Sequence, residues 1–394
     1  MPHPSDAHIG ARLREVRKRR GLTQRELAQA SGVSLSLIRK LEQGELRDTR
    51  LETARRLAVA LRVPTTRLIC RDTEHAEAGT VDRWEPVRRA LAAPLPLRGQ
   101  DDPPTVEGVR DALAAAQPLF AGDRFAELAE VLPPLLRDAD ALAGESAARP
   151  VRVRLHQLVG WLMVQTRQYD AAEIALERAL ADASDRLQAA ATVNTVCWLR
   201  LRQGRLHQAL ELAARWADEV EPRISRATPE ELSTWGWLLL RVSAAAVRDN
   251  RPSEAEDALR TARAAAVMLG REHAPGDDFL RAFGPITVAL KCAENASVTD
   301  RPDKVLALAA RIPSAELRPT SNNRNRHLLD VADAHVKTRH YSESVEVLRS
   351  IHAASPQWLP NQRYARDILK RVIGRRRTLT AEMRELADAV ALPL

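Results

Sequence analysis

The chain has 394 residues, 45% of them hydrophobic and 28% charged, so it can bury a core and is too long for one compact domain. Aromatic residues make up only 4%, and the abundant Ala, Leu, Arg and Glu are good helix formers, which favours an all-α fold. The three cysteines have no metal-ligand or redox spacing, and neither a secretion signal nor an apolar stretch of about 18 residues occurs. These features predict a cytoplasmic protein with reduced thiols, no metal site and no membrane span.

The net charge is concentrated at the N-terminus. Residues 1–70 contain 15 Lys and Arg against 7 Asp and Glu, a net charge of +8, whereas the remaining 324 residues contain 45 of each sign. A small basic domain attached to a large neutral one indicates that the first meets nucleic acid and the second meets another partner.

The first two helices are predicted from apolar spacing and capping signals. Helical spacing predicts a first helix that ends at Gly21, with inward positions Ile9, Leu13 and Val16. Thr23 and Glu26 have the spacing of a capping box and open a second helix that runs to Ala30.

A sharp turn separates the second helix from a third. Gly32 permits the turn, Ser34 caps the third helix, and Gly44 ends it. The apolar residues that the third helix buries are Ile38 and Leu41. A fourth helix over residues 51–61 and a short fifth after Pro64 complete a five-helix bundle with a helix-turn-helix arrangement.

The stretch "LTQRELAQASGVSLSLIRKLEQG" resembles the phage-repressor-like, or Xre-type, DNA-binding domain, and the likeness extends over residues 9–69. It implies that the second helix of the pair enters the major groove of a double-stranded DNA operator. The expected base-reading residues are Leu35, Ser36 and Lys40, with Arg39 beside them on a base or a phosphate. The expected phosphate contacts are Gln24, Ser34, Arg47 and Arg50. In this family Arg17 and Glu42 fall where an ion pair commonly ties the first helix to the reading helix.

Residues 71–104 read as a junction. Proline-containing segments flank a short amphipathic stretch from Trp84 to Leu91 and forbid a continuous helix. The predicted domains are therefore a DNA-binding domain over 1–70, a linker with a short helix over 71–104, and a helical repeat domain over 105–394.

Six helical hairpins repeat after the junction. Each first helix carries a small residue at one register position, namely Ala116, Gly160, Cys197, Ser243, Ala293 and Ala332. Nine residues later comes a turn position, occupied by Phe125, Tyr169, Leu206, Pro252, Pro302 and Tyr341. Small residues let paired helices approach closely, as in a stacked array in which each unit buries its face against its neighbours.

The unit "VGWLMVQTRQYDAAEIALERAL" resembles a tetratricopeptide repeat. Successive units are 44, 37, 46, 50 and 39 residues apart, compared with about 34 in that family. The whole chain is similar to Xre-type regulators with a tetratricopeptide-like α-solenoid that are common in GC-rich Gram-positive bacteria, and more distantly to peptide-pheromone receptors.

The tetratricopeptide resemblance also implies a ligand groove. In tetratricopeptide proteins the concave face of the array is lined by the first helix of each unit, at the positions one after, three before and six before the small residue. In this chain those offsets select Trp161, Trp198, Gln157, Asn194, Arg154 and Trp237 as an effector site. The alternative is that these Trp side chains only pack in the core.

Two functions remain open at this stage. The chain contains no phosphate-cradling glycine loop and no hydrolase or zinc-protease motif, so we expect a protein without catalytic activity or cofactor. The favoured function is a homodimeric transcriptional regulator whose repeat domain responds to a small molecule or peptide. The alternative is a DNA-bound adaptor whose repeat domain docks a partner protein.

Overall fold

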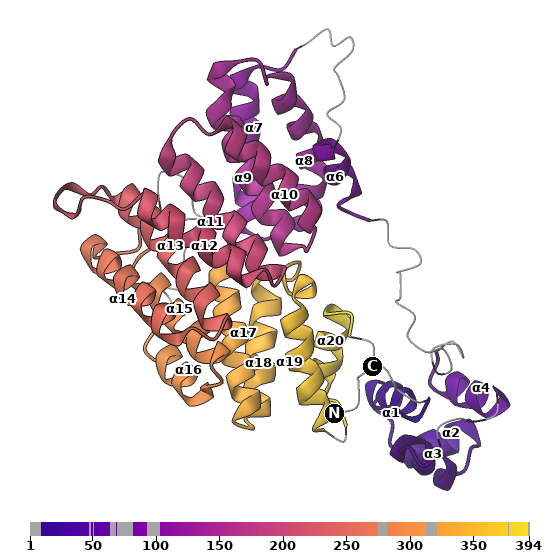
Figure 1. Cartoon of the computed structure of the whole chain (residues 1–394). Helices are drawn as coiled ribbons and strands as arrows, with labels where there is room; N and C mark the ends of the chain where they lie inside the picture. Colours follow the sequence, from indigo (N-terminus) through magenta and orange to yellow (C-terminus); the bar gives the residue numbers. More distant parts are fainter. Residues whose placement is uncertain are drawn as a thin grey trace. The chain divides into compact units, whose positions relative to one another are not determined.

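The computed structural model describes residues 9–46, 49, 51–63, 68, 82–92, 103–274, 282–312, 321–376 and 378–392. Regular structure over these residues is helical, apart from one isolated bridge between His273 and Phe283, so the predicted all-α class is confirmed there. The chain forms two compact units (Figure 1): unit 1 is Met1–Val81 with Arg363–Leu394, and unit 2 is Asp82–Gln362. None of the described helices is long and apolar enough to cross a membrane.

The helices of unit 1 begin and end where local capping signals place them. Its helices are α1 (Ile9–Arg19), α2 (Gln24–Ser31), α3 (Leu35–Gln43), α4 (Leu51–Ala60), α19 (Arg363–Gly374) and α20 (Ala381–Ala389). Thr23 and Glu26 form the predicted capping box on α2, and Gly32 ends that helix with a φ of 65°. The predicted fifth helix after Pro64 falls almost entirely outside the described residues.

Helices α1 and α3 approach each other at Gly10. A β-carbon at this position would lie 1.6 Å from the carbonyl oxygen of Leu41, so the contact requires glycine. The core around it consists of apolar side chains from all four N-terminal helices, including Leu13, Leu27, Ile38 and Leu57. This packing holds α3 against α1.

The last two helices of the chain belong to unit 1, which the sequence did not predict. The Lys18 ammonium of α1 donates to the carbonyl oxygen of Ile373 at 3.4 Å, and Arg19 forms an ion pair with Asp388 of α20. The compact units therefore differ from the predicted ranges 1–70, 71–104 and 105–394.

The helix predicted as part of a linker also packs differently. Helix α6 (Glu85–Ala92) contacts α8 and α10 of unit 2. Arg88 donates to Gln168 at 2.8 Å, and the Trp84 ring meets Phe125 edge-on at 6.2 Å between centroids. Because the apolar face of α6 is covered by the first hairpins, this helix is the start of unit 2.

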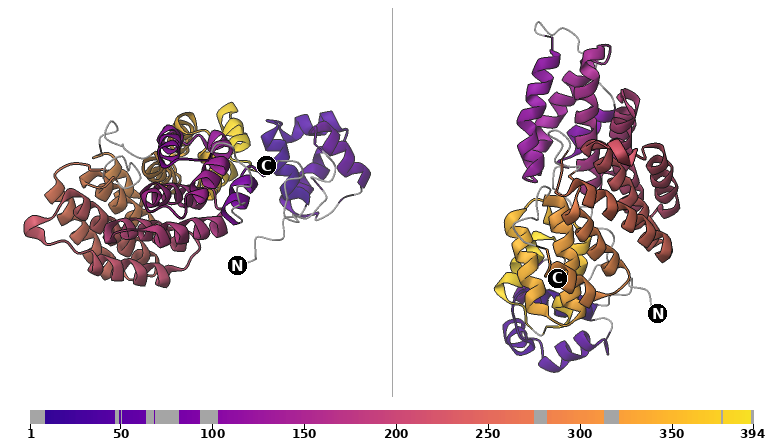
Figure 2. Two further views of the ribbon diagram at one scale, coloured as in Figure 1. Left: turned by 90° about the horizontal axis from the view of Figure 1, so that it is seen from above. Right: turned by 90° about the vertical axis from the view of Figure 1, so that its left-hand side faces the viewer.

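Unit 2 contains six consecutive helical hairpins, which lie side by side in chain order (Figures 1 and 2). They are α7 (Val106–Ala121) with α8 (Phe125–Ala141), α9 (Arg149–Gln165) with α10 (Tyr169–Asp182), α11 (Arg186–Arg202) with α12 (Leu206–Glu219), α13 (Pro229–Arg248) with α14 (Pro252–Leu269), α15 (Pro285–Val298) with α16 (Pro302–Ala309), and α17 (Ser321–Lys337) with α18 (Tyr341–Ala354). Every second helix begins at the predicted turn position.

One turn geometry closes all six hairpins. Two residues before each second helix φ is positive: 54° at Asp123, 64° at Arg167, 76° at Gly204, 56° at Asn250, 55° at Asp300 and 66° at Arg339. The next N–H in each hairpin donates to the carbonyl oxygen five residues earlier at 2.8 or 2.9 Å. This pair of features is the Schellman ending of a helix, so every first helix stops in the same way.

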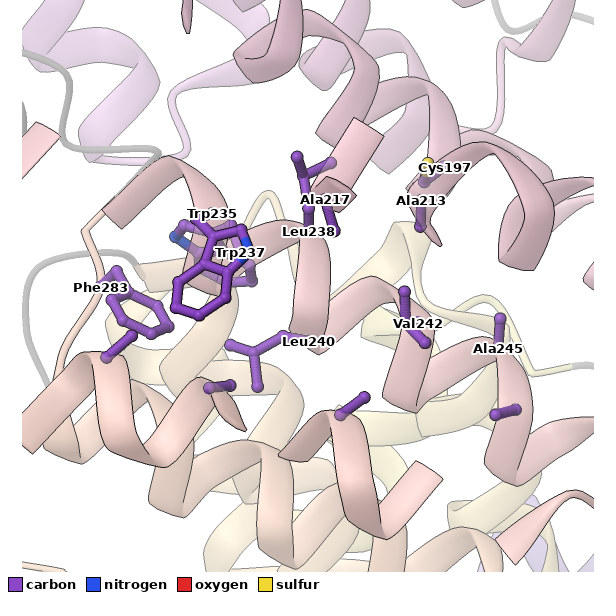
Figure 3. Packing of buried hydrophobic residues seen from close by; sticks show 14 of the residues in the cluster. Cys197, Ala213, Ala217, Trp235, Trp237, Leu238, Leu240, Val242, Ala245 and Phe283 are labelled. Carbon is purple, nitrogen blue, oxygen red and sulfur yellow. The ribbon is translucent and has the colours of Figure 1, made fainter. Parts of the chain in front are cut away.

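The small residue of each hairpin lies at the contact between its two helices. Ala116, Cys197, Ser243, Ala293 and Ala332 are all buried. A β-carbon on Gly160 would lie 2.6 Å from the Leu176 side chain of the paired helix. Gly236 of α13 allows a second close contact, because a β-carbon at this position would lie only 2.1 Å from the Phe283 ring. The Phe283 ring packs in the same apolar cluster as the buried side chains of α13 (Figure 3).

The repeated turn predicts opposite effects for two exchanges at equivalent positions. Arg167→Gly should stabilise unit 2 by about 1 kcal/mol because a left-handed conformation is costly for a residue with a β-carbon, and Gly204→Ala should destabilise it by a similar amount. All seven Trp residues lie in unit 2, so urea unfolding followed by Trp fluorescence measures its stability alone. Gly144→Ala, in open space without a positive φ, is the control. Shifts of the same sign for both exchanges would contradict a shared turn.

Two buried histidines predict acid sensitivity of unit 2. Burial lowers the pKa of His156 to about 4, helped by Arg152 and Arg178, and burial also lowers the pKa of His327 to about 4, helped by Lys291. Unfolded histidine takes up its proton near pH 6.5, so between pH 6.5 and 4 the unfolded chain binds more protons and stability falls as pH falls. Each histidine should contribute a loss of about 3 kcal/mol over this window.

The variant His156→Leu tests this pH dependence. Its urea stability should fall by about 3 kcal/mol less than that of the unchanged protein between pH 7 and pH 4, because one proton uptake is removed. Equal losses for the two proteins would show that His156 is already charged when folded.

Candidate functional site

Helix α3 presents polar side chains outward from a fixed start and end. The Ser34 hydroxyl accepts from the Leu37 N–H at 3.3 Å, and Gly44 ends the helix with a φ of 81°. The buried face of α3 consists of Ile38, Leu41 and Glu42. The predicted contact residues Ser34, Ser36, Arg39 and Lys40 are exposed, and Leu35 is half-buried. The structure therefore places the predicted base-reading residues on or beside one accessible helix face.

A buried polar network braces this helix. The Arg17 guanidinium donates to both carboxylate oxygens of Glu42, at 2.6 and 2.7 Å, so the predicted pair is present and bidentate. The same guanidinium donates to the carbonyl oxygen of Leu22 at 2.8 Å, and the Gln24 amide donates to Glu42 at 2.8 Å. The Arg17 and Glu42 side chains are 7% and 2% exposed, so the network lies within the domain rather than on the exposed face of α3.

The predicted phosphate contacts have different outcomes. Gln24 is half-buried at the start of α2, and its bond to Glu42 uses only one of its two amide hydrogens. Ser34 keeps its hydroxyl proton as a donor while it caps α3. The predicted contacts Arg47 and Arg50 lie outside the described residues.

A second candidate site is a cavity of about 40 Å³ in unit 2. Its lining comes from α9, α11, α13, α15 and α17, the first helices of five consecutive hairpins. The lining residues are Trp161, Asn194, Thr195, Trp198, Trp237, Arg241, Lys291, Asn322, Asn323 and Arg326. The repeated turn thus brings together side chains that are up to 165 residues apart, from position 161 to position 326.

Four of the six predicted effector residues, Trp161, Asn194, Trp198 and Trp237, line this cavity. The other two, Arg154 and Gln157, do not line it. Gln157 instead donates to Thr192 at 2.9 Å and to the carbonyl oxygen of Gln188 at 3.2 Å, which ties α9 to α11. The structure therefore places Gln157 between neighbouring helices, and a role for Gln157 or Arg154 in binding an effector stays a prediction.

Three cationic residues of the cavity were missed by the sequence analysis. Arg326 lies six residues before the small residue Ala332, the same offset that selected Trp237. Arg241 and Lys291 each lie two residues before the small residue of their helix, an offset outside the three that the tetratricopeptide resemblance implies. The repeat register could therefore have predicted Arg326 as a lining residue. Arg241 and Lys291 could be identified only from the structure.

The cations pack against the indole rings. The Arg241 guanidinium carbon lies 5.2 Å from the Trp237 ring centroid and 6.0 Å from that of Trp198. Arg326 lies 5.8 Å from Trp198, and the Lys291 nitrogen lies 5.9 Å from Trp237. Burial lowers the pKa of Arg241 to about 10 and, with the charge of Arg202, the pKa of Arg326 to about 9. The cavity lining therefore carries cations whose charge is disfavoured by partial burial.

Two carboxylates lie close to the lining. Glu294 accepts from Lys291 at 2.7 Å and from Arg248 at 2.6 Å. Burial alone would raise the pKa of Glu294, but the charges of Lys291 and Arg248 hold that pKa well below its usual range. Burial and the charge of Glu294 raise the pKa of Asp330 to about 7. One nearby carboxylate is therefore committed to two cations, and the other is only partly ionised near neutral pH.

Comparison with known proteins identifies only the N-terminal part of the chain. Residues 13–68 match the helix-turn-helix family model. No curated protein and no solved structure matches the chain. The match covers α2 and α3 with their braced turn, so the chain carries an Xre-like helix-turn-helix domain, which indicates a DNA-binding transcriptional regulator.

The buried network predicts the effect of Arg17→Ala. Removing one partner leaves the Glu42 carboxylate buried without its cation, which should destabilise the N-terminal helices by about 3 to 5 kcal/mol. Because Arg17 is a buried residue of α1 and is not on the exposed face of α3, the preferred DNA sequence should stay the same. Thermal unfolding by circular dichroism measures the loss, while Trp fluorescence, confined to unit 2, should report an unchanged transition. If the unfolding temperature of the N-terminal helices stayed the same, or if the preferred DNA sequence changed, the bracing role of Arg17 would be contradicted.

Proposed function

We propose that this protein is a sequence-specific, operator-binding transcriptional regulator, without catalytic activity, that reads DNA with α3. The observation that carries the proposal is the exposed row of Ser36, Arg39 and Lys40 on a helix that is braced from behind by Arg17 and Glu42. Exposed polar side chains on a rigid helix can reach base edges in the major groove at fixed positions. The concentration of positive charge in residues 1–70 supports attraction to the phosphate backbone.

We further propose that the protein binds its operator as a homodimer. Helix α3 has nine residues and spans about 13 Å, which is enough to read only a few base pairs. Two such helices related by a two-fold axis read half-sites about 34 Å apart, one turn of B-DNA, and so specify a longer site.

The repeat domain is the proposed sensor. The six hairpins with a common turn support a tetratricopeptide-like stack, and the cavity gathers side chains from five of them. A small molecule or peptide in this cavity contacts several hairpins at once and therefore favours one arrangement of them. A coupling of about 1 to 3 kcal/mol between such a site and the reading helix is the usual size for allosteric regulators.

A second candidate function is an adaptor whose repeat domain docks a partner protein. Two neighbouring apolar side chains on α14 favour it, since Val267 is 69% exposed and Met268 is 44% exposed. Small-molecule screening by thermal stability separates the two functions, because an effector that fills the cavity stabilises the folded protein by mass action. A Val267→Ser, Met268→Ser variant that keeps operator response would argue against the adaptor.

The DNA-reading proposal predicts the effect of Lys40→Ala. Loss of a base-edge donor should relax preference at one position of each half-site and weaken operator binding by about 1 to 3 kcal/mol. Binding-site selection followed by titration of the selected duplex at fixed salt measures both effects. Lys304→Ala, which removes an exposed lysine of α16, controls for the loss of one positive charge. Full retention of base preference by the Lys40 variant would show that α3 reads DNA in another register.

A further inference from the structure

The residues that line the cavity in unit 2 carry positive charge only. Three cations line it, Arg241, Lys291 and Arg326, and none of the described residues that line it is a carboxylate. Lys291 shares Glu294 with Arg248. Within the described part of the chain, neither Arg241 nor Arg326 forms an ion pair.

The contacts of the two guanidinium groups leave donors unused. The Arg241 Nε atom donates to the neutral amide oxygen of Asn194 at 2.7 Å, and its remaining N–H groups form no ion pair with the described residues. Arg326 packs against the Trp198 ring. Both guanidinium groups pack against aromatic rings, and the nearby carboxylates Glu294 and Asp330 offset their charge only in part, because Glu294 is shared with Lys291 and Arg248. A bound anion would therefore offset a desolvation cost that the protein leaves in place.

The amides of the lining complement the same kind of ligand. The Asn194 oxygen is used by Arg241, and the Asn322 oxygen accepts from the Trp358 indole N–H at 3.3 Å. The same indole N–H donates to Gln165 at 2.6 Å, and both asparagine side chains keep amide N–H groups that can donate to a ligand. Donors and cations converge on a volume of about 40 Å³, which is about the room that three water molecules need and matches one carboxylate or phosphate group.

We propose that this cavity binds the oxyanion group, carboxylate or phosphate, of a small organic effector, held by Arg241 and Arg326. The inference rests on the proposed function in which the repeat domain holds an effector, and it adds the chemical class. The planar guanidinium forks match the paired oxygens of both groups, and the Trp161 and Trp198 rings provide apolar surface for the body of the molecule. Because the anion contacts α13 and α17 together, its arrival ties the fourth hairpin to the sixth.

The test uses the full chain and three probes: inorganic phosphate, benzoate, and benzamide as a neutral molecule of the same shape as benzoate. Binding is measured by Trp fluorescence and by thermal stability, with ionic strength held constant by sodium chloride. Benzoate or phosphate should raise the unfolding temperature, and benzamide should bind at least tenfold more weakly than benzoate. The ratio between phosphate and benzoate distinguishes a phosphate-bearing effector from a carboxylic acid.

Arginine variants locate the site. Arg241→Gln and Arg326→Gln should each weaken binding of the preferred anion at least tenfold, whereas Arg260→Gln on the exposed face of α14 should not change it. In the ligand-free protein Arg326→Gln should keep or raise the unfolding temperature, because it removes a half-buried charge that has no ion-pair partner among the described residues. A lower unfolding temperature for Arg326→Gln without loss of anion binding would mean that the arginine is structural, and would overturn the proposal.

The remaining outcomes separate this inference from the proposed function. Equal binding of benzamide and benzoate, or no response to either anion at 10 mM probe, roughly the strength expected of such small fragments, would overturn the oxyanion site. Neither result touches operator reading, which the Lys40→Ala selection tests by itself. If a neutral compound stabilises the unchanged protein but not Trp198→Ala, the cavity still holds an effector, and only the chemical class is wrong.

Discussion

The repeated hairpin turn is the constraint on which unit 2 depends. Each first helix ends with a left-handed residue at the same position and with the same backbone hydrogen bond, so each second helix folds back from its partner through the same turn. The small residue seven positions before that left-handed residue then sets how closely the two helices lie. With six copies of one turn, the same face of every first helix points in a related direction. The cavity is a consequence, since all of its lining residues come from first helices.

The cavity is a region where buried charge weakens the fold instead of stabilising it. Arg241 and Arg326 lie among indole rings, and the nearest carboxylates are either shared, as Glu294 is, or partly protonated, as Asp330 is. Well-packed apolar residues would stabilise this region more than buried cations do. In unit 1 the corresponding ionic contact is complete: Glu42 receives both Arg17 and Gln24 and is almost fully buried. The two networks differ in whether the protein itself supplies the counter-charge.

Local signals explain what could be predicted from the sequence. The ends of α2 and α3 follow from Thr23, Gly32, Ser34 and Gly44, because caps and left-handed glycines act over three or four residues. The hairpin turns were found because they keep a nine-residue distance from a small residue. Offsets from the same small residue predicted four of the residues that line the cavity, and one of those offsets also applies to Arg326. It could not find Gln157's role, because which neighbour takes up an amide depends on how far one hairpin is rotated against the next.

Contacts between distant segments left no such signal. The amphipathic face of α6 was visible in the sequence, but nothing local shows that α8 and α10 cover it. The grouping of Arg363–Leu394 with the N-terminal helices depends on a pairing across more than 350 residues, such as Lys18 with Ile373, and a single sequence does not encode it as a pattern.

The contact between the two ends of the chain also determines when unit 1 can be completed during synthesis. Unit 1 is the discontinuous unit, with its first part made before unit 2 and its last part made after it. During translation the ribosome therefore releases α3 early, while α19 and α20 emerge only when all six hairpins have been made. Until then Lys18 and Arg19 have no contact with Ile373 and Asp388. A nascent or truncated chain can fold α1 to α4 around their own core, yet it presents a surface of α1 that the finished protein covers.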